Sequence, residues 1–149
     1  RRRRRRGCGC LYDPGGDGGC VSNRCRGDQQ TLLHHAAAKG CDDHILTYLL
    51  DNGLAIDATD SMGRTPLHYA ARRIHRYYEH TQQVTVCQLL IKKGAKVDKV
   101  DNEQKTMLHH AAAGGDMQVC KIFIDHRVDL NLEDKFQRKA LYYAANTKR

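Results

Sequence analysis

The 149-residue sequence contains no tryptophan, only two phenylalanines and only two prolines. With so few large rings, a hydrophobic core must be built from Ala, Leu, Val and Ile, and so little proline excludes a proline-rich linker protein. No run of about 18 apolar residues is present, so no transmembrane helix is predicted. The length suits one ordinary domain and is too short for two.

The positive charge of the chain is unevenly distributed. Lys and Arg outnumber Asp and Glu by 25 to 17, and residues 1–30 carry eight arginines against three aspartates. Residues 1–27 are also rich in Gly and Cys and poor in aliphatic side chains, so we expect a disordered basic tail. Because most of the excess charge lies in that tail, the high isoelectric point is no evidence that the folded part binds nucleic acid.

A short pattern recurs through the rest of the chain, and internal repeats of this period are typical of solenoid proteins. Four segments match Thr-Pro-Leu-His-x-Ala-Ala in whole or in part, and their starts are 34, 41 and 33 residues apart. The first three are each followed by a second apolar block and a turn. The segments begin at Thr31, Thr65, Thr106 and Lys139.

These residues resemble the ankyrin repeat, a unit of about 33 residues with two antiparallel helices and a projecting turn. The resemblance covers residues 28–149 and implies an all-α ankyrin-repeat α-solenoid of three repeats plus a truncated fourth, preceded by the disordered basic tail of residues 1–27. It divides the domain into repeats at about 28–60, 61–101, 102–134 and 135–149. The opening stretch, Asp28 to Ala36, is also similar to the C-terminal ankyrin segment of some diacylglycerol kinases.

Several residues are expected to maintain the repeat structure. The threonine hydroxyls suit helix N-caps, and Pro66 suits a first helical position, where its missing N–H costs nothing. The resemblance implies that the repeat histidines bond to the backbone of adjoining segments. Leucines at one repeat position should form a buried row. The structural residues are Thr31, His34, Thr65, Pro66, His68, Thr106 and His109; the leucines are Leu33, Leu67, Leu108 and Leu141.

The position after each histidine carries a ring: His35, Tyr69, His110 and Tyr143. We expect these four side chains to form a ladder that is partly exposed towards a concave groove and binds a partner. The alternative is a half-buried filler position. Because successive repeats lie too far apart to share ligands at about 2 Å, we expect no metal site.

The second repeat carries an insertion, residues 72–80, that is rich in Arg, His and Tyr. Arg and Tyr are enriched at binding hot spots, so Arg73, Arg76, Tyr77 and Tyr78 are predicted to contact a partner. The alternative is a surface insertion without function, because lengthening a loop costs little free energy.

The sequence contains no nucleophile–base arrangement, phosphate loop or paired-carboxylate motif, so we expect neither an enzyme nor a cofactor. The predicted function is an adaptor or scaffold that binds a protein partner of unknown identity. Two alternatives remain. The chain is a regulatory ankyrin segment of a larger multidomain protein such as a lipid kinase, or it uses its Arg tail to bind polyanions (nucleic acid or inositol lipid). A protein partner is favoured over nucleic acid. An odd number of cysteines and no secretory signal peptide favour a reducing compartment, so we expect a cytoplasmic or nuclear monomer.

Overall fold

A computed structural model describes residues 28–72 and 80–147. These residues form seven helices. The helices are α1 (Leu32–Lys39), α2 (Asp43–Asp51), α3 (Pro66–Ala71), α4 (His80–Lys92), α5 (Met107–Gly114), α6 (Met117–Asp125) and α7 (Ala140–Asn146). The expected disorder of residues 1–27 concerns a segment that lies outside the described residues.

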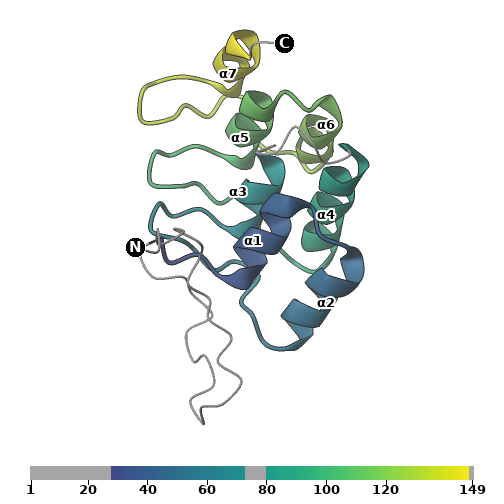
Figure 1. The fold of residues 1–149 in the computed structure, drawn as a ribbon. Coiled ribbons are helices and arrows are strands. Elements are labelled where there is room, and N and C mark those ends of the chain that lie inside the picture. Colours follow the sequence, from purple (N-terminus) through teal and green to yellow (C-terminus); the bar gives the residue numbers. More distant parts are fainter. Residues whose placement is uncertain (1–27, 73–79, 148–149) are drawn as a thin grey trace, which may run out of the picture.

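The helices stack in two layers (Figure 1). In the inner layer α1 packs against α3, α3 against α5 and α5 against α7, while in the outer layer α2 packs against α4 and α4 against α6. Each of the first three inner helices also packs against the outer helix that follows it in sequence. The turns that enter the inner helices project together from one side of the stack. The described chain is therefore an all-α solenoid of repeated helix pairs.

The inner helices begin and end where local chemistry dictates. Thr31, Thr65 and Thr106 occupy the N-cap positions of α1, α3 and α5, and Pro66 is the first residue of α3. Gly40 and Gly115 cap the C-termini of α1 and α5 in the left-handed conformation, with φ of 66° and 71°. Glycine adopts this conformation without a steric penalty from Cβ.

The core lies between the two layers and between successive inner helices. Leu33, Leu67 and Leu108 are buried there, among alanines whose small side chains let the helices approach closely. The prediction of one buried leucine row is wrong at Leu141, whose side chain is 77% exposed. Helix α7 packs against α5, and no other described helix makes a comparable contact with it, so Leu141 has no second helix to cover it.

Candidate protein-binding surface

Four turns, here called fingers, lead into the inner helices. They are the first finger (28–31), the second (57–65), the third (98–106) and the fourth (131–139). Backbone hydrogen bonds join each finger to the next: the N–H groups of Ser61, Asn102 and Lys135 donate to the carbonyls of Asp28, Met62 and Glu103, with N···O distances of 2.8–2.9 Å. The fingers therefore form one continuous, mutually supported edge.

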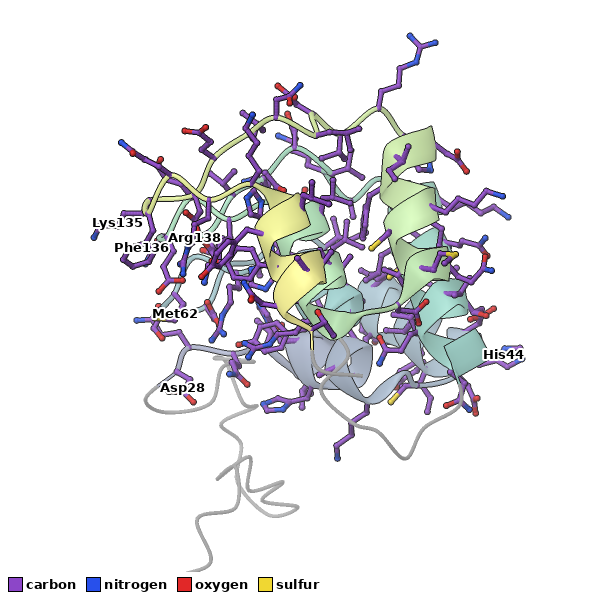
Figure 2. The ribbon with its side chains drawn as sticks, turned by 90° about the horizontal axis from the view of Figure 1, so that it is seen from above. Asp28, His44, Met62, Lys135, Phe136 and Arg138 are labelled. Carbon is purple, nitrogen blue, oxygen red and sulfur yellow. The ribbon has the colours of Figure 1, made fainter. Side chains whose placement is uncertain are left out.

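Figure 2 shows this edge from above. The labelled residues Asp28, Met62, Phe136 and Arg138 lie together on one side of the molecule, and His44 of α2 lies on the opposite side. The fingers and the outer helices thus present separate surfaces.

A buried aspartate organises the second finger. Oδ1 of Asp60 accepts hydrogen bonds from the N–H groups of Met62 and Arg64, both at 2.9 Å. Its Oδ2 atom accepts a 2.5 Å hydrogen bond from the Tyr69 hydroxyl and forms an ion pair with Arg64. Burial alone would raise the pKa of Asp60, but the hydrogen bonds from Tyr69 and the Arg64 N–H outweigh it and lower the pKa.

The same arrangement recurs in the later fingers. Asp101 accepts the N–H groups of Glu103 and Lys105 at 2.9 Å, and its Oδ2 atom pairs with Nε2 of His110. Asp134 accepts the N–H groups of Phe136 and Arg138 at 2.8 and 2.9 Å, and its Oδ2 atom accepts a bond from the Tyr143 hydroxyl. Each aspartate fixes the shape of its own finger and ties it to the following helix.

Two of the three repeat histidines, His34 and His109, join neighbouring repeats in one defined tautomer. Nδ1 of His34 accepts the Thr31 N–H at 3.0 Å, and Nε2 lies 2.9 Å from the Arg64 carbonyl of the next repeat. Because a backbone N–H only donates and a carbonyl only accepts, the ring is neutral with its proton on Nε2. Burial lowers the pKa of His34 and favours this neutral form.

His109 repeats this geometry. Its Nδ1 atom accepts a hydrogen bond from the Thr106 N–H, and its Nε2 atom lies 3.0 Å from the Arg138 carbonyl oxygen. In His68, Nδ1 accepts the Thr65 N–H, but Nε2 does not reach hydrogen-bonding geometry with any described residue. Burial, followed by the nearby His110, dominates and lowers the pKa of His68 to about 3.

The expected ladder of exposed rings is wrong at two positions. Tyr69 and His110 are only 8% and 6% exposed. The Tyr69 hydroxyl is hydrogen-bonded to Asp60, and Nε2 of His110 is hydrogen-bonded to Asp101. Their rings also contact the histidine of the preceding repeat edge to face: Tyr69 meets His34 at 5.4 Å, and His110 meets His68 at 5.2 Å between centroids. Coverage by the preceding repeat removes these two rings from the surface.

The other predicted binding residues have different positions. His35 and Tyr143 are half-buried, and the Tyr143 hydroxyl is bonded to Asp134. Burial lowers the pKa of His35, as does the nearby Lys39. The insertion residues Arg73, Arg76, Tyr77 and Tyr78 lie outside the described residues.

The exposed side chains of the fingers were not among the binding residues predicted from the sequence. Met62 and Phe136, at the same position of the second and fourth fingers, are 42% and 57% exposed. The only sequence signal was a large apolar residue within a polar turn.

Among the described residues, no group of His, Cys, Asp and Glu side chains has a geometry that could hold a metal ion. None of the described helices has the length and apolar character needed to cross a membrane.

These features define a helical repeat scaffold with one edge of linked turns. The family model "Ankyrin repeats (3 copies)" matches residues 8–99 and 74–149, and the chain belongs to the ankyrin-repeat family. The match begins at residue 8, within the segment that the sequence analysis assigned to the tail. Ankyrin repeats are in general non-catalytic and mediate protein–protein interaction.

Three similar proteins illustrate the setting of such segments. The chain is 38% identical to inversin of Danio rerio over 98 residues, which cover 66% of the chain and 9% of that protein. It is 39% identical to diacylglycerol kinase iota of Homo sapiens over 92 residues (60% and 8%). It is 30% identical to a transient receptor potential cation channel subfamily A member 1 homolog of Caenorhabditis elegans over 130 residues (81% and 10%). The chain thus spans about a tenth of each relative or less.

Proposed function

We propose that this chain is a non-catalytic module that binds a protein partner through its fingers and the adjoining inner helices. The observation that supports this proposal is the linked edge of fingers, on which Met62 and Phe136 remain exposed while the aspartates of the same fingers are buried. Tyr142, on the adjoining inner helix α7, is exposed as well. Side chains on a rigid, pre-formed edge lose little conformational freedom on binding, so more of their contact energy appears as affinity.

The rings of Tyr69 and His110 support this surface from beneath and make no direct partner contact in this proposal. His35 and the insertion residues Arg73, Arg76, Tyr77 and Tyr78 remain part of the proposed surface. Their support is chemical: Arg can engage carboxylates bidentately, and Tyr adds rigid contact area at low entropic cost.

A partner selected from a displayed protein library tests this proposal. Met62→Ala and Tyr77→Ala should each weaken binding by about 1–2 kcal/mol and leave the thermal unfolding midpoint unchanged. Gln88→Ala is the matched control, because Gln88 is exposed on the outer helix α4. If the affinity responds to Gln88→Ala and ignores both other variants, the finger surface is not the binding surface.

We also propose that the module works within a longer polypeptide. The support is the size of its relatives, of which the chain covers only 8–10%. In such a protein the repeats would regulate or localise another domain by holding a partner. Sequencing full-length transcripts tests this: an open reading frame confined to these residues would contradict it.

A further inference from the structure

The fourth finger and α7 carry a group of aromatic and basic side chains, here called the fourth-finger subsite: the exposed Lys135, Phe136, Lys139 and Tyr142 and the half-buried Arg138. The rings of Phe136 and Tyr142 are 57% and 50% exposed. The guanidinium carbon of Arg138 lies 4.4 Å from the ring centroid of Phe136 and 5.4 Å from that of Tyr142. Exposed aromatic rings beside arginine are typical of binding hot spots.

Arg138 is held in place from below. Its Nε and Nη2 atoms both lie 3.2 Å from Oδ2 of Asp134, a buried carboxylate. The Asp134 carboxylate also accepts hydrogen bonds from the Tyr143 hydroxyl and from the N–H groups of Arg138 and Phe136. Burial alone would raise its pKa, but these hydrogen bonds, that of Tyr143 first, lower the pKa to about 2. The Arg138 guanidinium is therefore held beside the Phe136 and Tyr142 rings before any partner arrives.

The charge of the fingers changes sign along the stack. The second finger contains two acidic residues and one basic residue, and the third contains three acidic and two basic. The fourth contains three basic residues and two acidic ones, Glu133 and the buried Asp134. Within the described ranges, Lys135 and Lys139 are exposed and form no ion pair with another residue. Two cations are thus available to an acidic partner.

We infer that the fourth-finger subsite binds an extended, acidic protein segment with an apolar or aromatic side chain. This inference rests on the proposed function and specifies the chemistry of the partner. The segment places carboxylates near Lys135 and Lys139 and its apolar side chain against Phe136 and Tyr142. A nucleic acid is disfavoured because its phosphates, continuing along the fingers, would meet the net negative third and second fingers.

A random peptide library of twelve-residue sequences displayed on phage, selected on the whole 149-residue chain, tests the inference. A parallel selection uses the double variant Lys135→Glu/Lys139→Glu. The control is Lys92→Glu/Lys93→Glu, which makes the same change in net charge at two exposed lysines at the end of α4. Wild type and control should enrich peptides that combine Asp or Glu with a large apolar residue. The Lys135→Glu/Lys139→Glu variant should not.

The best enriched peptide, made synthetically with a fluorescent label, should bind about tenfold more weakly to Lys135→Glu/Lys139→Glu and to Phe136→Ala, and within about twofold of wild type to the control. Urea unfolding of each variant verifies that it folds. Failure to enrich acidic peptides on the wild type would overturn the inference, as would equal affinity for both double variants. Tighter binding of an oligouridine that is lost in Lys135→Glu/Lys139→Glu would assign the subsite to nucleic acid and overturn it too.

The two proposals fail differently. If the partner from the protein library loses affinity with Met62→Ala but retains it with Phe136→Ala and Lys135→Glu/Lys139→Glu, the subsite inference falls and the proposed function stands. If that partner is insensitive to all of these changes, both fall.

Discussion

Nε2 of His110 lies 2.9 Å from Oδ2 of Asp101, and both side chains are buried. The second and fourth repeats use a tyrosine hydroxyl for the same purpose, in Tyr69 and Tyr143. Burial alone would raise the pKa of Asp101, but the hydrogen bonds from His110 and the Lys105 N–H outweigh it and lower the pKa. The carboxylate is therefore ionised at neutral pH, and the finger depends on it.

Replacing Asp101 by alanine tests this dependence. Asp101→Ala removes the acceptor of the Glu103 and Lys105 N–H groups and leaves His110 without its partner. An orphaned buried polar group costs about 1–3 kcal/mol, so we expect the free energy of unfolding to fall by about 3 kcal/mol in urea titrations at pH 7. Asp98→Ala, at an exposed position of the same finger, should cost less than about 0.5 kcal/mol. Equal effects of the two changes would show that Asp101 does not organise the finger.

Stability should fall as the solution is made acidic, because His34, His68 and His109 are held neutral. The folded-state pKa of each is lowered by burial, that of His68 to about 3, whereas the unfolded value is near 6.5. Above pH 6.5 both states are neutral and the full stability is present. Between pH 6.5 and 3 the unfolded state binds more protons, so His68 alone removes up to about 1.4 kcal/mol per pH unit.

Urea unfolding at pH 7, 6, 5 and 4 measures this slope. His68→Gln should reduce stability at pH 7 and make the slope shallower, whereas His126→Gln, at an exposed position, should leave the slope unchanged. The aspartates act in the same direction at lower pH: the lowered pKa values of Asp60, Asp101 and Asp134 give stability that is present above about pH 4 and lost below it. An unchanged slope in His68→Gln would contradict the neutral-histidine account.

The leucine row offers a comparison within one repeat position. Leu67 is fully buried and Leu141 is 77% exposed. Leu67→Ala should destabilise the protein by about 2–5 kcal/mol because it leaves a cavity, and Leu141→Ala should change stability by less than about 0.5 kcal/mol. Thermal unfolding monitored by circular dichroism separates these values. A large loss in Leu141→Ala would mean that α7 is covered in solution.

Arg127 should be replaceable with a gain in stability. Gly53 and Gly94 follow α2 and α4 with φ of 86° and 100°, and Arg127 occupies the corresponding turn after α6 with φ of 59°. A non-glycine residue in the left-handed region costs about 1–2 kcal/mol, so Arg127→Gly should stabilise the protein by about 1 kcal/mol in urea unfolding. The reverse change, Gly94→Arg, should destabilise it by a similar amount. A loss of stability in Arg127→Gly would indicate that the arginine side chain makes compensating contacts.

The repeat fold could be predicted from the sequence because its causes are local and recurrent. The N-cap threonines, Pro66 and the leucine spacing identify each inner helix without knowledge of its neighbours. Whether a side chain at a given repeat position is exposed depends instead on the neighbouring repeats. Tyr69 and Leu141 occupy positions that the pattern describes well, yet Tyr69 is buried against the preceding repeat, whereas Leu141 is exposed among the described helices.

The finger surface was not predictable in the same way. Met62 and Phe136 are apolar, but the third finger carries Glu103 at the same position, so no repeat pattern marks this position. The role of Asp60 in fixing Tyr69 was also hidden, because the two residues are nine apart in the sequence and meet only after the finger folds back on the helix.

Hydrogen exchange of the chain, alone and with the library-selected protein partner, tests whether the fingers are the binding surface. We predict that the bound partner slows amide exchange in the second, third and fourth fingers, at residues 57–65, 98–106 and 131–139, and leaves the exposed faces of α2, α4 and α6 unchanged. Protection confined to those outer helices, with no change in the fingers, would contradict it.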